Sequence, residues 1–165
     1  MRYLLDSNTL IEAKNRYYHM AICPGYWQWI LHKNQTREIG SITMIADELL
    51  RGDDELRDWA ADHAGIFVPI TDAPTQEAFA TVAAQVAAQS PRMKVGALED
   101  FLSGADPWLI AKAMVTGAAV VTHEAFNPDV KRKFLIPNVC RHFGVQVLNT
   151  FELLHTLKAE FVLPG

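Results

Sequence analysis

The sequence predicts an α/β fold, a three-layer sandwich in which helices cover both faces of a parallel sheet. Short apolar segments alternate with helix-like segments five times along the chain, which is typical of βαβ units. The clearest strand candidate, residues 118–122 (AAVVT), is apolar throughout rather than alternating, as in a parallel strand buried on both faces. Hydrophobic residues make up 50% of the chain and charged residues 21%, so a sizeable core is available and global disorder is excluded.

The N-terminal half is expected to contain three strands and four helices. The first strand stops at Asp6, after which Ser7 or Asn8 is expected to cap a helix. Pro24-Gly25 breaks the chain before an amphipathic segment, and Thr43 is expected to cap the helix after the second strand. The expected elements are, in order, a strand at 3–5, a helix after 7–8, a helix at 26–33, a strand around 39–41, helices at 44–50 and 53–63, and a strand at 66–70.

The C-terminal half is expected to contain the other two strands. An Ala- and Gln-rich segment predicts a long helix, and Asp106-Pro107 predicts a helix start because proline suits the first helical position. Thr150 is expected to cap the last helix. The expected elements are, in order, a helix at 74–89, an exposed loop at 90–104, a helix from 106, a strand at 118–122, a helix at 138–143, a strand at 145–148 and a helix at 151–159.

No repeat, linker or composition shift marks a second domain, so residues 1–165 are predicted to form a single domain. The net charge of −4 excludes a uniformly basic nucleic-acid-binding surface, although a local basic rim stays compatible with it. Two cysteines, Cys23 and Cys140, are too few for a disulfide framework and favour a reduced, cytoplasmic setting. No apolar run approaches the roughly 18 residues of a membrane span, and no secretion signal is visible. We therefore expect no membrane association.

Four acidic residues lie where separate segments reach the carboxyl edge of the predicted sheet. Asp6 follows the first strand, Glu48 lies in the helix after the second, Asp106 starts the helix before the fourth, and Glu124 follows the fourth. Ligands of open parallel sheets bind beyond this edge, near the point where strand order reverses. Taken singly, each acid has a structural explanation, as a helix cap for Asp6 and Asp106 or as a solvated side chain. Together they predict one acidic pocket.

The negative charges of clustered carboxylates repel one another and must be compensated by a cation or by bound protons. Two carboxylates about 4 Å apart repel each other by about 4 kcal/mol at an effective dielectric constant near 20. Oxygen ligands with few histidines suit Mg²⁺ or Mn²⁺ rather than zinc. Such an ion can supply hydroxide and stabilise charge on a phosphoryl group. The residue types therefore point to phosphodiester hydrolysis or phosphate transfer.

Four motifs resemble, in order, those of the PIN-domain ribonucleases. They are residues 3–11 (YLLDSNTLI), 48–52 (ELLRG), 106–111 (DPWLIA) and 120–124 (VVTHE). The chain is particularly similar to a PIN-like subgroup of unknown function that carries the V-T-H-E and I-P-N-V-C stretches, here at 121–124 and 136–140. The resemblance spans nearly the whole chain, which makes it more specific than any single motif.

The resemblance implies a five-stranded parallel sheet of order 3-2-1-4-5 and a metal-dependent endoribonuclease. One or two Mg²⁺ or Mn²⁺ ions would be held by four catalytic acids: Asp6, Glu48, Asp106 and Glu124. Ser7 and Asn8 would orient Asp6, and the Thr122 hydroxyl would hydrogen-bond an attacking water. Glu124 departs from the family, which usually has Asp there. Many small PIN proteins are toxins of bacterial toxin–antitoxin pairs, so the resemblance also implies RNA as substrate, a cognate antitoxin protein and a homodimer.

Contacts with RNA are predicted from one tight basic run. Lys131, Arg132 and Lys133 follow Glu124 closely, and together with Arg141 they predict a phosphate-binding rim. A solvated surface loop explains the same run equally well. His123, next to Glu124, is an alternative metal ligand or general base.

Two other functions stay open. A PIN-like scaffold that binds RNA or a protein without cutting is one, because Glu124 departs from the family pattern. The other is a haloacid-dehalogenase-type phosphatase, since Asp6-Ser7-Asn8-Thr9 approaches a D-x-D-x-T loop whose first Asp is a nucleophile. Asn8 replaces the second acid of that loop, and no downstream Lys with a paired-Asp motif is visible. Dinucleotide binding is excluded because no GxGxxG follows the first strand.

Overall fold

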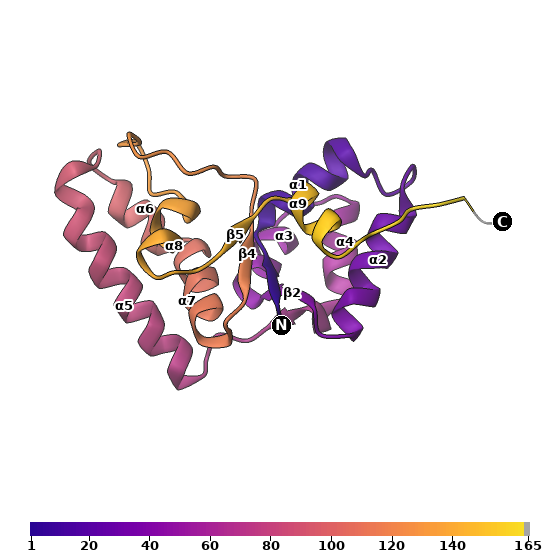
Figure 1. Cartoon of the computed structure of the whole chain (residues 1–165), viewed down its shortest axis with the longest axis horizontal. Coiled ribbons are helices and arrows are strands. Elements are labelled where there is room, and N and C mark those ends of the chain that lie inside the picture. Colours follow the sequence, from indigo (N-terminus) through magenta and orange to yellow (C-terminus); the bar gives the residue numbers. More distant parts are fainter. Residues whose placement is uncertain (164–165) are drawn as a thin grey trace.

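The fold is an α/β arrangement around a five-stranded, all-parallel sheet of order β3-β2-β1-β4-β5, as predicted (Figure 1). The computed structural model describes residues 1–163. The elements are, in order, β1 (Tyr3–Leu5), α1 (Ser7–Glu12), the π-helix η1 (Ala13–Tyr17), α2 (Pro24–Gln35), β2 (Ile39–Ile42), α3 (Thr43–Leu50), α4 (Glu55–Asp62), the 3-10 helix η2 (Ala64–Ile66), β3 (Phe67–Val68), α5 (Ala73–Gln89), the 3-10 helix η3 (Ser90–Arg92), α6 (Ala97–Ser103), α7 (Asp106–Thr116), β4 (Ala119–Val121), α8 (Ile136–His142), β5 (Val147–Leu148) and α9 (Thr150–Thr156).

The central strand β1 sets the position of the site. Leu4 of β1 pairs with Gly40 of β2, and Leu5 pairs with Val121 of β4, both in parallel register. Every residue of β1 and β4 is buried, which explains why neither strand alternates between apolar and polar residues. Since parallel strands end at the same edge, the residues that follow β1 and β4 lie side by side there.

Helices cover both faces of the sheet. In Figure 1, α5, α6, α7 and α8 lie on one side of the strands, and α1, α2, α4 and α9 lie on the other. The long helix α5 packs against α7, where the rings of Phe79 and Trp108 stack with centroids 3.9 Å apart. On the other side Trp27 and Trp59 meet edge to face at 5.1 Å. Trp27 and Trp59 are buried, and Trp108 is partly buried against the core.

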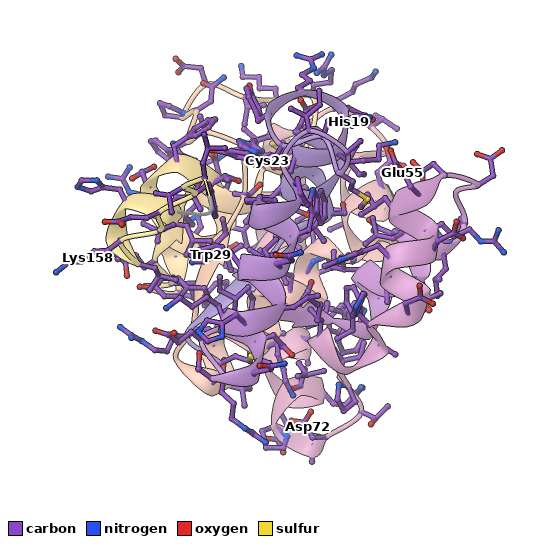
Figure 2. The ribbon with its side chains drawn as sticks, turned by 90° about the vertical axis from the view of Figure 1, so that its right-hand side faces the viewer. His19, Cys23, Trp29, Glu55, Asp72 and Lys158 are labelled. Carbon is purple, nitrogen blue, oxygen red and sulfur yellow. The ribbon has the colours of Figure 1, made fainter. Side chains whose placement is uncertain are left out.

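The helix α5 runs from the amino edge of the sheet to its carboxyl edge. Its N-cap Asp72 accepts a hydrogen bond from the Thr75 backbone and pairs with Lys112 of α7 at 2.9 Å. Figure 2 shows Asp72 at the lower end of the molecule, with His19 and Glu55 at the upper end, where β1 and α1 meet in Figure 1. The far end of α5 therefore lies at the same end of the molecule as the carboxyl edge, on the outer left in Figure 1.

Three predicted helix caps were wrong by one residue. Asp6, rather than Ser7 or Asn8, caps α1, because its carboxylate accepts from the Ser7 backbone. Helix α3 begins at Thr43 itself, with Ile42 at the N-cap position and no side-chain cap. Asn149 caps α9 through a capping box with Glu152, so Thr150 is the first helical residue.

The predicted loop at 90–104 was also wrong. It contains η3 and α6, and α6 begins after Gly96, whose φ of 93° lies in the left-handed region that favours glycine. Ala97 and Phe101 are buried four residues apart, a helical spacing that the segment's charged residues obscure. The helix predicted at 138–143 begins earlier, at Ile136, since Pro137 suits its first turn. Among residues 1–163, no helix combines the length and apolar character needed to cross a lipid bilayer.

Candidate active site

Asp6 lies at the end of β1 and is held from two sides. Its Oδ1 accepts a hydrogen bond from the Ser7 backbone at 2.7 Å, and its Oδ2 accepts from the Thr122 hydroxyl at 2.9 Å. The side chain is only 3% exposed. Burial is the main reason why the pKa of Asp6 is raised to about 6; Glu124 and Glu48 add to the rise, while the hydrogen bonds from Thr122 and Ser7 oppose it.

Thr122 connects the ends of β1 and β4. Its hydroxyl donates to Asp6, and its oxygen accepts from the Asn8 amide at 3.3 Å and from the Glu124 backbone at 3.2 Å. The Asn8 carbonyl in turn accepts from the His123 backbone at 3.2 Å. Ser7, Asn8 and Thr122 thus all hydrogen-bond with Asp6 or with the residues next to it. The Thr122 proton is donated to Asp6, which makes Thr122 a positioning residue for that carboxylate.

Asp106 is the second acid whose pKa is strongly raised. It is the first residue of α7, and its side chain forms no cap hydrogen bond, so a capping role does not explain it. Burial is the largest cause of a pKa raised to about 8; Asp6, Glu124 and Glu48 raise it further, and Lys133 opposes them. Asp6 and Asp106 therefore both lie close enough to Glu48 and Glu124 for those charges to raise their pKa values.

Glu124 has a structural partner as well as an electrostatic one. Its Oε1 accepts a hydrogen bond from the Ile136 backbone at 3.0 Å, at the start of α8. This contact fixes the carboxylate between β4 and α8 while its charge still acts on Asp6 and Asp106. Glu48 is half-buried on α3 and contributes through charge in the same way.

The acids do not form a closed metal cage. In the part of the chain that the structure describes, no group of three or more His, Cys, Asp or Glu side chains is arranged to hold a metal ion. What the structure brings together is an acidic edge in which two carboxyls are largely buried. Their donor chemistry, carboxylate oxygens only, fits a hard divalent cation.

His123 faces an aromatic cluster. Its Nε2 and the Thr150 hydroxyl are 3.2 Å apart, and burial lowers the pKa of its imidazole. The rings of Tyr17 and Phe151 lie 6.1 Å from His123, and both side chains are about half exposed. Sequence reasoning missed Tyr17 and Phe151, since the π-helix that carries Tyr17 gives no periodic signal.

Three of the four predicted basic residues gather around one cavity. Lys131, Lys133 and Arg141 line a cavity of about 530 Å³, whereas Arg132 is exposed and does not line it. The Arg141 guanidinium lies over the Phe126 ring at 4.4 Å. The Gln85 side chain, from the far end of α5, also lines this cavity and was missed, because it lies 46 residues before Lys131 in the sequence.

Fold and site together define an α/β protein with a buried acidic site at the carboxyl edge of a parallel sheet. A family model described as "Domain of unknown function (DUF4411)" matches residues 3–161. The match covers nearly the whole chain, so the chain belongs to this family. No curated protein matches the chain.

Proposed function

We propose that this chain is a PIN-like, metal-dependent endoribonuclease that hydrolyses RNA phosphodiester bonds. The observation that carries the proposal is the mutual effect of the four acids on the pKa values of Asp6 and Asp106. Buried like charges are unfavourable unless protons or a cation compensate them, and perturbed pKa values cluster at functional sites. Four different segments supply these acids, which is difficult to explain by local capping alone.

Asp6, Glu48, Asp106 and Glu124 would hold one or two Mg²⁺ or Mn²⁺ ions. When bound, such an ion supplies a nucleophilic hydroxide at neutral pH and stabilises charge on the phosphoryl oxygens. The acids would have to approach one another to share an ion. Glu48 and Glu124 are suited to this, because both are half-buried and have long side chains.

The residues around Asp6 prepare its carboxylate for this role. Thr122 and the Ser7 backbone hydrogen-bond both oxygens and so favour the charged form against the effect of burial. Asn8 fixes the turn after β4 by accepting from His123 and donating to Thr122. These contacts restrict Asp6 to one orientation before any ligand arrives, which is how supporting hydrogen bonds tune a metal ligand.

A second candidate is a non-catalytic RNA- or protein-binding module. Two observations favour it: the hydrogen bond from Ile136 gives Glu124 a structural role, and within residues 1–163 no three of these groups are arranged to hold an ion. The phosphatase alternative receives no such support. Asn8, at the position of the second acid of the D-x-D-x-T loop, donates to Thr122 and accepts from the His123 backbone, so it supports the turn after β4 instead.

Cleavage of a mixed-sequence RNA with and without Mn²⁺ separates the two candidates. For the nuclease, we expect metal-dependent cleavage that falls by about 100-fold or more in Asp6→Asn and Asp106→Asn, since a supporting residue alone is worth 10–100-fold. Asp47→Asn is the matched control, because Asp47 is an exposed acid beside Glu48 on the same helix. RNA binding without cleavage in every chain would favour the module.

We include in this proposal that the chain is the toxin of a toxin–antitoxin pair. A toxin of a toxin–antitoxin pair would arrest growth when expressed alone, and a small cognate antitoxin would co-purify with it and restore growth. Unaffected growth on strong expression without any partner would contradict the toxin role while leaving the nuclease chemistry to be judged by the cleavage assay.

A further inference from the structure

A cavity of about 530 Å³ lies between the far end of α5, the segment 125–135 and α8. This volume is within the range of small-molecule sites. Glu124 connects it with the acids, because its carboxylate accepts a hydrogen bond from the Ile136 backbone at 3.0 Å, directly after Leu135 of the cavity lining. Any ligand in the cavity would therefore be a neighbour of the proposed catalytic centre.

The segment that walls the cavity is held in place by hydrogen bonds. The Asn138 amide of α8 donates to the Asn127 carbonyl at 2.7 Å, and the Asn127 backbone donates back to the Asn138 side chain at 3.0 Å. At the other end of the segment, the Lys94 backbone donates to the Lys131 carbonyl at 2.7 Å. The cavity is thus largely formed before a ligand binds, which reduces the entropic cost of binding.

The lining of the cavity combines three kinds of surface. Phe126, which is 45% exposed, offers aromatic surface, whereas Phe134 lines the cavity but is largely buried. Lys131 and Arg141 add positive charge at the same cavity. A ligand that fits all three surfaces has a flat, partly apolar ring, a hydrogen-bonding edge and a negative charge.

Gln85 supplies the third kind of surface in the cavity lining, a hydrogen-bond acceptor. Its Oε1 is buried and has no hydrogen-bond partner, one of two such side-chain atoms among residues 1–163, the other being the indole nitrogen of Trp59. A buried acceptor without a partner is costly, so native proteins rarely retain one without a reason. Trp59 lies on the other side of the sheet, whereas Gln85 lines this cavity. Since this oxygen has almost no accessible surface, a ligand N–H would satisfy it once the Gln85 side chain turns toward the cavity.

We propose that this cavity binds one nucleotide unit of an RNA strand. The base would lie against the face of Phe126 that the Arg141 guanidinium does not cover and would donate to Gln85, and the phosphate would lie at Lys131 and Arg141. Aromatic surface for the base and cations for the phosphate are the usual elements of single-strand recognition. The placement of this nucleotide next to the cleaved bond rests on the proposed nuclease function. The cavity would then position the strand so that the neighbouring phosphodiester reaches Asp6 and Asp106.

Binding is measured by fluorescence anisotropy of a labelled single-stranded oligoribonucleotide, in EDTA so that no cleavage occurs. Gln85→Leu should weaken binding about fivefold, the effect of one lost hydrogen bond. Arg141→Gln should weaken it and reduce the slope of log Kd against log salt by about 0.7, the value for one single-strand phosphate contact. Lys158→Gln is the matched control, because Lys158 follows α9 across the sheet from α5 and projects into solvent in Figure 2.

The natural ligand of the cavity is either part of an RNA strand or a free nucleotide. Competition with a nucleoside monophosphate distinguishes these two ligands. Competition between the monophosphate and the oligoribonucleotide, with an inhibition constant that rises about fivefold in Gln85→Leu, supports the proposal. Monophosphate binding that depends on Gln85 while RNA affinity does not depend on it would overturn the assignment to RNA. Absence of RNA binding by the unmodified chain, or equal affinities for the cavity variants and Lys158→Gln, would overturn it as well.

Failure of this inference is distinguishable from failure of the proposed function. If the unmodified chain cleaves RNA and the cavity variants change neither Kd nor KM, the nucleotide site is wrong and the nuclease stands. RNA can instead bind through the cavity while Mn²⁺ causes no cleavage, or causes cleavage that persists in Asp6→Asn. In that case the nuclease is wrong and the nucleotide site stands.

Discussion

The hydroxyl of Thr122 donates a hydrogen bond of 2.9 Å to Oδ2 of Asp6, across 116 positions of the chain. The contact follows directly from strand pairing, because Asp6 and Thr122 come one residue after Leu5 and Val121, which face each other in register. It places a hydroxyl against a carboxylate that is 3% exposed. The orientation of Asp6 thus depends on the parallel pairing of β1 and β4.

Replacing Thr122 with Val removes this hydroxyl at nearly constant volume. Three hydrogen bonds are lost, to Asp6, Asn8 and the Glu124 backbone. We expect a loss of about 1–3 kcal/mol in the free energy of unfolding, because the buried carboxylate keeps one oxygen without a donor. Urea denaturation measures this loss. Thr122→Ser should retain most of the stability, whereas equal losses in the two variants would show that the hydroxyl is unimportant.

Replacing Glu124 with Gln separates its charge from its hydrogen bond. The Gln side chain can still accept from the Ile136 backbone, so the start of α8 should keep its structure. Removal of one negative charge also lowers the pKa of Asp6 and Asp106. We therefore expect unchanged or higher stability in EDTA, together with an affinity for Mn²⁺ that falls about tenfold or more. Calorimetric titration of Mn²⁺ into both chains checks the second effect, and an unchanged affinity would remove Glu124 from the metal site.

The perturbed carboxyls predict how stability depends on pH. In the folded chain the pKa values of Asp6 and Asp106 are raised from 3.8 to about 6 and about 8, so the folded state binds more protons than the unfolded state between these limits. Their contribution to stability is complete below about pH 4 and is lost as the pH rises through 6 and 8.

The comparison that isolates this effect is with Asp106→Asn. In EDTA, the stability of the unmodified chain should fall more steeply between pH 5 and pH 8 than that of the variant. Any contribution from His123, whose pKa is lowered by burial, is common to both chains and cancels in the difference. Parallel stability curves over this range would contradict the raised pKa of Asp106.

Long apolar and periodic segments made most of the fold predictable. The buried segment around Val120 predicted a parallel strand, and the resemblance to PIN domains added the strand order that the structure has. Exact helix starts were less predictable because Asp6 and Asn149 compete with their hydroxyl neighbours for the same cap position. The helix α6 was missed because a single positive-φ residue, Gly96, starts it.

The site was predictable in its residues and not in its geometry. Asp6 and Glu124 each follow a predicted strand in the sequence. Because parallel strands end at the same edge of a sheet, the two acids could be placed at that edge. Which group donates to which carboxylate depends on side-chain rotamers and on the segment 125–135, which has no periodic pattern. Gln85 was unpredictable for a similar reason: only the packing of α5 against that segment gives it a place in the cavity.

Titration of Mn²⁺ into the unmodified chain and into Asp106→Asn, with Asp47→Asn as the control, tests most directly whether the four acids share a cation. We expect saturable binding to the unmodified chain and the control, stronger at pH 8 than at pH 6 because protons compete for Asp6 and Asp106. The affinity of Asp106→Asn should be about tenfold or more lower. No saturable binding to the unmodified chain, or equal binding to all three, would contradict a shared cation site.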